Sequence, residues 1–231
     1  MLTPAEWEAV GLSLRVSAVA VLITAPFGVA LAYLLARRRL PAPFLIENIV
    51  QLPLVLPPVV TGWVLLIAFS PGASLGVWLE SAFGIRIAFT WFGAAVAAGV
   101  VSFPLMVQTI RVAFEQVDPA WEEAGYVYGG DRAAVFRHVT APLAARGIAA
   151  GIVLAFGRAL GEFGATIVLA GNIPAETRTL PLAIFTQINR IGGEPAVLRL
   201  VLVAVALSAA SVVIHAALRR RLVSGADRLE R

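Results

Sequence analysis

The chain has 231 residues, of which 59% are hydrophobic and 14% are charged. Its mean hydropathy of +0.87 is far above that of an ordinary soluble domain and indicates an integral membrane protein. All 18 basic residues are arginines, and the formal net charge is +4. The absence of lysine excludes a Walker A loop, whose lysine contacts the nucleotide phosphates, so any ATP that drives the protein must be bound by another chain.

The sequence has no cysteine and two histidines, which excludes thiolate ligands and histidine-rich metal clusters. His138 is expected in a loop, and His215 is expected to cap the inner end of the last span. Glu162 is an acidic residue inside a predicted span and has no second carboxylate there, which disfavours an intramembrane enzyme. We therefore expect no catalytic residue, no metal site and no cofactor on this chain.

Five hydrophobic segments are long enough to span a membrane, because a hydrocarbon core of about 30 Å takes about 20 helical residues. The first begins within the N-terminal stretch MLTPAEWEAVGLSLR, which lacks the basic start of a cleaved signal peptide, so we expect this segment to be retained. The sequence thus predicts an all-α polytopic membrane protein with a single transmembrane domain over 1–231. The predicted spans are 10–36, 45–69, 87–110, 148–170 and 196–218.

Arginines are distributed unevenly between the two sides of the predicted membrane. Twelve lie after the first, third and fifth spans, whereas four lie on the other side. Since basic residues accumulate on the cytoplasmic side, the N-terminus is predicted outside and the C-terminus in the cytoplasm. The twelve are Arg37, Arg38, Arg39, Arg111, Arg132, Arg137, Arg146, Arg219, Arg220, Arg221, Arg228 and Arg231, and the four are Arg86, Arg178, Arg190 and Arg199.

The loop before the last span contains a short apolar run, 179–191. Leu182, Phe185 and Ile188 recur in it at helical spacing. This run is too short to cross a membrane, so we predict a short helix that is half inserted or lies on the surface. A truncated sixth span is the alternative.

A polar stretch, 115–146, separates the third and fourth spans and is predicted on the cytoplasmic side. Asp118 and Pro119 are typical of a helix start, because aspartate caps free amides and proline has no amide to lose. Gly129 and Gly130 predict where this first helix ends. Helices this short are marginal in water without tertiary contacts, so another surface must hold them.

The second helix of the polar stretch is predicted to follow Asp131 and to end near Pro142. One face of the first helix carries aromatic and small side chains, with Glu122 and Glu123 beside it. This face is expected either to pack on the protein's own membrane helices or to dock on another protein. It consists of Trp121, Ala124, Gly125 and Tyr128.

The same stretch resembles the EAA motif of ABC importer permeases, which reads Glu-Ala-Ala, three residues, Gly, nine residues, Ile-x-Leu-Pro. The spacing is kept, while Gly125, Val139 and Ala141 depart from the motif; glycine for alanine loosens a helix by up to about 1 kcal/mol. The resemblance implies a type I ABC importer permease fold in which 118–142 is the coupling segment that seats on a cytoplasmic ATP-binding subunit. The coupling residues that it implies are Glu123, Ala124, Gly125, Gly129, Val139 and Pro142.

Arg158 and Glu162 lie four residues apart inside the fourth span. A lone charge near the membrane centre costs about 2.5 to 3.5 kcal/mol on translocon scales, so we expect the two side chains to pair on a face directed into the bundle. The pair is expected either to lock this span to its neighbours or to line the path of an anion. The shared face comprises Gly147, Gly151, Arg158, Gly161, Glu162 and Ala165.

Prolines are expected to interrupt the second and third spans. The backbone groups that they free are expected to line a water-filled cavity or to act as hinges, although membrane helices also tolerate proline for packing alone. These residues are Pro53, Pro57, Pro58 and Pro104.

Several stretches resemble the molybdate ABC transporter permeases, and the likeness covers nearly the whole chain. They are QLPLVLPPVVTGW, VSFPLMVQTIR, FGRALGEFGATIVLAGNIPAETRTLPLAI and the coupling segment. Sulfate and thiosulfate permeases share the Gly-Glu-Phe/Tyr-Gly core but are typically longer, and tungstate is not separable from molybdate. A secondary anion transporter is a distant alternative, for which the sequence shows no inverted repeat.

This resemblance implies a homodimer whose two copies line one path, in the lipid bilayer of a prokaryotic inner membrane. Two ATPase subunits, which carry the ATP and Mg²⁺, and an extracytoplasmic molybdate-binding protein are the implied partners; no nucleic acid is expected. The residues placed near the path or gate are Arg158, Glu162, Gly161, Gly164, Pro57, Pro58 and Thr61.

Overall fold

The computed structural model describes residues 2–226, and within this range the chain consists of helices and loops, without a β-strand. A bent pair of helices, α2 (Pro43–Val55) and α3 (Pro58–Phe69), gives a fifth crossing if it is counted as one span. The predicted all-α architecture with about five spans is confirmed. The four long helices that are apolar enough to cross a membrane are α1 (Pro4–Ala36), α5 (Trp91–Glu115), α8 (Ala141–Leu160) and α11 (Glu194–Ala226).

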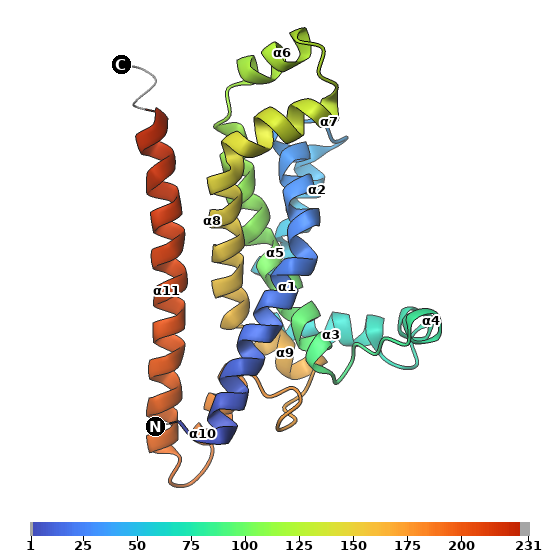
Figure 1. Ribbon diagram of the computed structural model, residues 1–231. Helices are drawn as coiled ribbons and strands as arrows, with labels where there is room; N and C mark the ends of the chain where they lie inside the picture. The colour runs from blue at the N-terminus through green and yellow to red at the C-terminus, as the bar shows by residue number, and fades with distance from the viewer. Residues whose placement is uncertain (1, 227–231) are drawn as a thin grey trace.

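The helices α1, α5 and α8 pack on one another, and α11 lies along α8 (Figure 1). Helix α1 begins beside α10, whereas α11 ends at the opposite end of the bundle, where α6 and α7 lie. An odd number of crossings requires this arrangement. We call the two ends the α10 end and the α6 end. Of the arginines that predict the orientation, Arg228 and Arg231 lie outside the described residues.

The core depends on small side chains that let helices approach closely. Alanines of α5 pack against α1 towards the α10 end, and larger side chains of α5 fill the core towards the α6 end. The alanines are Ala94, Ala95 and Ala98, and the larger side chains are Met106, Ile110 and Phe114.

Gly151 of α8 lies so close to α5 that an added β-carbon would come within 2.6 Å of Ile110 Cγ1. Replacing Gly151 with valine is expected to lower the free energy of unfolding by about 1 to 3 kcal/mol, because the core must open to admit the side chain. The control is Gly11→Ala, since Gly11 has open space around it. Thermal unfolding in detergent measures both, and an unchanged melting temperature of the Gly151→Val protein would contradict close packing here.

The second predicted span, 45–69, is two helices rather than one, because α2 and α3 are bent by 108° relative to each other. Leu56 and Pro57 have extended backbone, since proline disfavours the helical conformation of the residue before it and two prolines follow in succession. Pro53 and Pro104 lie inside α2 and α5. The prediction that these two interrupt their spans is wrong: a single proline removes one hydrogen bond, and a helix held by its neighbours continues.

The fourth predicted span, 148–170, is also broken. Helix α8 ends at Leu160 and the short α9 (Gly164–Leu169) follows. The carboxylate of Glu162, in the break, accepts a hydrogen bond of 2.9 Å from the Ala165 amide, which satisfies a free amide in the first turn of α9. Apolar periodicity did not reveal this break, because the segments on both sides of it are helical and hydrophobic.

The short helices α4 (Ser74–Phe83) and α10 (Leu180–Ile188) lie in the connections that precede α5 and α11. Helix α10 confirms the short helix predicted within 179–191 and packs on α1 and α11. Its buried side chains are Leu180, Leu182 and Ala183, whereas Phe185 and Ile188 are largely exposed, so only part of the predicted apolar face is buried. The placement of this helix at the membrane surface stays a prediction.

Candidate coupling and translocation sites

The polar stretch forms a short helix, α6 (Pro119–Val127), at one end of the bundle, and α7 (Arg132–Val135) follows it (Figure 1). Asp118 caps α6 by accepting a hydrogen bond of 2.9 Å from the amide two residues on. Pro119 is the first helical residue. The predicted start of the first helix is therefore confirmed, and it rests on side-chain capping and not on burial.

Glycine ends α6 as predicted. Gly129 has a φ of +85°, a left-handed conformation that favours glycine. The Gly130 amide donates a hydrogen bond of 3.1 Å to the Gly125 carbonyl, which is the pairing of a glycine helix stop. Asp131 then caps α7 by accepting a hydrogen bond of 2.7 Å from the Ala134 amide.

The second helix does not end near Pro142, contrary to the prediction. Helix α7 continues through a π-helical turn, Phe136–Thr140, into α8. The Ala141 amide donates to the carbonyl of Phe136, five residues back, and Pro142 lies in the first turn of the regular helix, where a missing amide costs little. The coupling segment is therefore joined to α8 by continuous helical backbone.

Helix α6 folds back on α7 and the π-helical turn at Gly125. A β-carbon added to Gly125 would lie 3.0 Å from Val135 Cγ2 and 3.6 Å from Val139 Cγ2. An alanine, which the EAA motif has at this position, would require Val135 to shift by a few tenths of an ångström. Glycine in place of the motif's alanine at this position therefore allows α6 to lie closer to Val135.

The outer side of α6 is exposed and partly apolar. The sequence predicted an aromatic and small face on this helix, with two glutamates beside it. Of these residues, only Glu122 and Gly125 are directed towards the rest of the protein. The expectation that the aromatic face packs on the protein's own membrane helices is therefore wrong. Exposed aromatic side chains of this kind are typical of a docking surface. The exposed residues are Trp121, Glu123, Ala124, Val127 and Tyr128, of which Tyr128 is 92% exposed.

Glu122 is buried beneath α6 in a cluster that the sequence did not reveal. Its Oε1 atom accepts hydrogen bonds from Arg37 Nη2 at 2.8 Å, from Arg37 Nε at 3.0 Å and from Thr140 Oγ1 at 2.8 Å. Arg37 Nη2 also donates to the Val117 carbonyl at 3.1 Å. The partners are 85 residues apart, and each lies next to residues of like charge, so no spacing pattern singled them out.

The predicted ion pair at the end of α8 is present. Arg158 Nη1 lies 2.8 Å from Glu162 Oε2. The Glu162 side chain is 2% exposed and that of Arg158 is 29% exposed, so the carboxylate is buried while the guanidinium reaches an open surface. A guanidinium in this position can donate to an anion while the carboxylate orients it. Of the other residues on the predicted face, Gly147, Gly151 and Ala165 are buried, whereas Gly161 is exposed.

The two broken spans meet, because α3 packs on α9. A β-carbon added at Gly164 would come within 2.8 Å of Pro58 Cβ, and one added at Gly62 would come within 2.8 Å of Ala165 Cα. Thr61 lies on α3 between these contacts and is buried, and its hydroxyl has no hydrogen-bond partner among the described residues. Such a hydroxyl is uncommon in a packed interior and marks the region as a candidate ligand site.

Two groups emerge from the residues predicted near the path or gate. Pro58, Thr61 and Gly164 lie at the contact of α3 with α9, and Arg158 and Glu162 form the ion pair. Pro57 and Gly161 are exposed at the two bends. Adjacent helix breaks with a charged pair offer backbone groups and charge to a ligand, as in transporters built on discontinuous helices.

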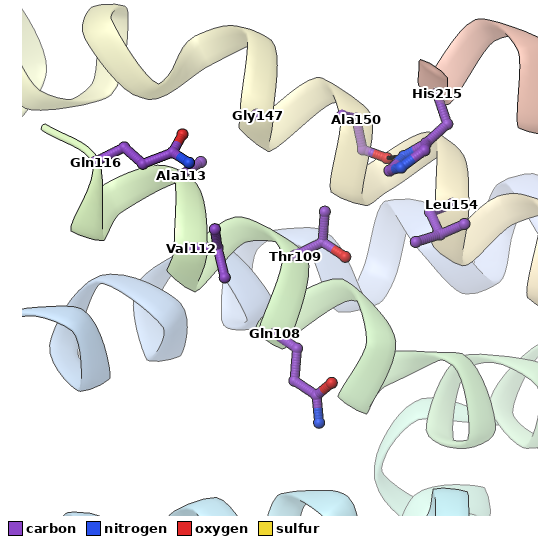
Figure 2. A pocket seen from close by; sticks show the side chains of 9 residues that line it. All are labelled: Gln108, Thr109, Val112, Ala113, Gln116, Gly147, Ala150, Leu154 and His215. Carbon is purple, nitrogen blue, oxygen red and sulfur yellow. Dashed lines mark hydrogen bonds between the residues drawn. The ribbon is translucent and has the colours of Figure 1, made fainter. Parts of the chain in front are cut away.

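A groove of about 270 Å³, lined by both polar and apolar side chains, opens between α5, α8 and α11 in the half of the bundle towards the α6 end. Figure 2 shows His215 of α11 directed at the Ala150 carbonyl of α8, at 2.9 Å from Nδ1. Because a carbonyl only accepts, Nδ1 carries the proton in this contact. His215 therefore ties two helices together and does not cap the end of α11, and His138 lies in the π-helical turn, not in a loop. Gln108 and Thr109 of α5 also line the groove, as does Gln116, which directly follows α5.

Comparison with known proteins identifies a family. A family model described as "Binding-protein-dependent transport system inner membrane component" matches residues 25–224. The "Molybdenum transport system permease protein ModB" of Escherichia coli (strain K12) is 49% identical over 220 residues, which are 95% of this chain and 96% of that protein. The "Sulfate transport system permease protein CysT" of the same organism is 37% identical over 171 residues, 74% of this chain and 61% of that protein.

Solved structures share the fold. A bacterial ABC transporter involved in the import of the acidic polysaccharide alginate superimposes with a TM-score of 0.69 at 20% identity, covering 95% of this chain and 80% of that chain. The family match includes the coupling segment and both broken spans. The chain therefore belongs to the binding-protein-dependent transport system inner membrane components, the multi-pass permeases of ABC importers.

Proposed function

We propose that this chain is the membrane-spanning permease of an ATP-driven importer of molybdate. Identity to ModB over nearly the full length of both chains supports this substrate. The weaker likeness to CysT makes sulfate the second candidate, and tungstate, a tetrahedral dianion of nearly the same size, is expected to share the molybdate path. A dianion does not cross hydrocarbon unaided, so a protein path that opens alternately to the two sides is needed.

In this proposal a separate ATPase subunit, which binds ATP and Mg²⁺, docks on the outer side of α6. The observation that carries it is the exposed aromatic surface of a short helix held to the protein only by its inner side. Glu123, Ala124 and Gly129 belong to the docking surface and its boundary. Gly125, Val139 and Pro142 shape the segment and its connection to α8.

Two copies of the permease enclose the path, and each receives one ATPase subunit. The α6 end faces the cytoplasm and the α10 end faces outside, where a binding protein delivers the anion. Arginines near the α6 end support this orientation, because basic residues favour the cytoplasmic side. The chain itself makes and breaks no bonds in this mechanism. Co-purification of the permease with a P-loop ATPase is the test, and a secondary transporter does not predict it.

We assign Arg158, with Glu162, to the anion path. Replacing Arg158 with glutamine is expected to lower molybdate uptake by more than about tenfold, because the path loses its donor to the anion and Glu162 remains as a buried negative charge. Uptake into vesicles that contain the whole importer is the measurement.

The double variant Arg158→Gln/Glu162→Gln separates a path role from a structural one, because it removes both charges and leaves no unpaired ion. A path role predicts that its uptake stays low. Uptake that returns to the wild-type rate in the double variant would show that the pair only holds the helix, and would contradict the assignment.

A further inference from the structure

The carboxylate of Glu122 joins three parts of the protein at one oxygen atom. Arg37, which ends α1, donates two hydrogen bonds to Oε1, and Thr140 of the π-helical turn donates a third. Arg37 also donates a hydrogen bond to the Val117 carbonyl, which ties it to the loop after α5. The inner side of α6 is therefore fixed to α1 and to the start of α8 at the same point.

Burial makes this connection stiff. The Arg37 and Glu122 side chains are 12% and 7% exposed, and Thr140 is fully buried. Separating a buried pair leaves an uncompensated charge in a medium of low dielectric, which is far more costly than breaking an exposed pair. The cluster therefore resists any motion of α6 that is not shared by α1.

We infer that Arg37 and Glu122 are positioning residues that transmit the movement of the docked ATPase from α6 to α1. This inference rests on the proposed docking at α6. Movement reaches α8 through the continuous backbone of the π-helical turn, and it reaches α1 through the ion pair. Helices α1 and α8, which also pack on each other, then move as one body when the ATPase closes.

The test compares molybdate taken up per ATP hydrolysed in vesicles that contain permease, ATPase and binding protein. Arg37→Gln and Glu122→Gln are each expected to lower this ratio by more than about tenfold while ATP hydrolysis continues. Arg37→Lys keeps the positive charge but loses the paired hydrogen bonds of the guanidinium. Its ratio is expected to lie between those of the wild type and Arg37→Gln. The control is Arg38→Gln, since Arg38 is exposed and its side chain forms no hydrogen bond or ion pair with a described residue; its ratio is expected within about twofold of the wild type.

Thr140→Val provides a second test that keeps the ion pair. It removes one of the three hydrogen bonds to Glu122 with little change of shape, and a fall of roughly threefold in the same ratio is expected. This variant decides the matter if the charge variants do not fold. An unchanged ratio in Thr140→Val and in the charge variants that fold would overturn the inference.

Co-purification separates the failure of this inference from that of the proposed function. Variants that still bind the ATPase but take up less molybdate per ATP hydrolysed support a link between α6 and α1. Variants that no longer bind the ATPase would overturn the inference, because the pair would then build the docking surface itself. A wild-type permease that binds no ATPase would instead refute the proposed function.

Discussion

Replacing Gly129 with valine is expected to lower the molybdate imported per ATP hydrolysed by more than about tenfold, while the membrane helices stay folded. Gly129 has a φ of +85° and open space around it, so the effect comes from the backbone and not from a collision. A left-handed conformation costs a non-glycine residue about 1 to 2 kcal/mol, and more when the side chain is β-branched. The end of α6 is then displaced from the docked ATPase. The ratio is measured in vesicles that contain the whole importer.

Gly84→Val is the matched control for this prediction. Gly84 ends α4 with a φ of +66° and also has open space around it, but it lies away from the coupling segment. The same backbone strain there is expected to leave the ratio within about twofold of the wild type. Gly129→Asn is expected to recover most of the coupling, because asparagine tolerates the left-handed region.

Glu123→Arg tests the docking surface itself, since Glu123 is exposed and its side chain forms no hydrogen bond or ion pair with a described residue. We expect this charge reversal to reduce the same ratio without reducing the amount of folded permease. Full coupling in both Gly129→Val and Glu123→Arg, with the ATPase docked, would contradict the assignment of the EAA-like segment.

Replacing Gly164 with valine is expected to reduce uptake per folded permease by more than about tenfold. The new β-carbon would lie 2.8 Å from Pro58 Cβ and 3.4 Å from the Val59 amide nitrogen, so α9 and α3 must separate where both spans are broken. Overpacking of this kind costs about 1 to 3 kcal/mol. If these breaks form the gate, the displacement changes transport as well as stability.

The matched control is Gly28→Val, in the contact of α1 with α5. A β-carbon there would lie 2.9 Å from Met106 Sδ, so the local crowding is similar but remote from the breaks. It is expected to lower the melting temperature while uptake per folded molecule stays within about twofold of the wild type. Equal uptake per folded molecule in Gly164→Val and Gly28→Val would mean that the contact of α3 with α9 serves packing alone.

The parts that the sequence predicted correctly depend on local chemistry or on segment length. Hydrophobic length predicted the long helices, the caps at Asp118 and Asp131 and the stop at Gly129 predicted the short helices α6 and α7, and the spacing of Arg158 and Glu162 predicted their ion pair. Each of these signals is contained within a few neighbouring residues or one apolar run, and tertiary contacts did not override them.

The features that could not be predicted from the sequence depend on contacts between distant segments. The pairing of Arg37 with Glu122 joins α1 to α6, and the hydrogen bond of His215 to Ala150 joins α11 to α8. The break after Leu160 was hidden because the hydrophobic pattern continues through it. Pro142 was predicted to end a helix, but the π-helical turn before it lets the helix continue.

Uptake of molybdate into vesicles that contain the permease, its cognate ATPase and the binding protein tests the central claim most directly. We predict that uptake requires ATP and both partners, that excess tungstate suppresses it and that excess sulfate suppresses it far less. Uptake that proceeds on an ion gradient without the ATPase would contradict the claim that this chain is an ABC importer permease, and sulfate that displaces molybdate at equal concentration would contradict the assigned substrate.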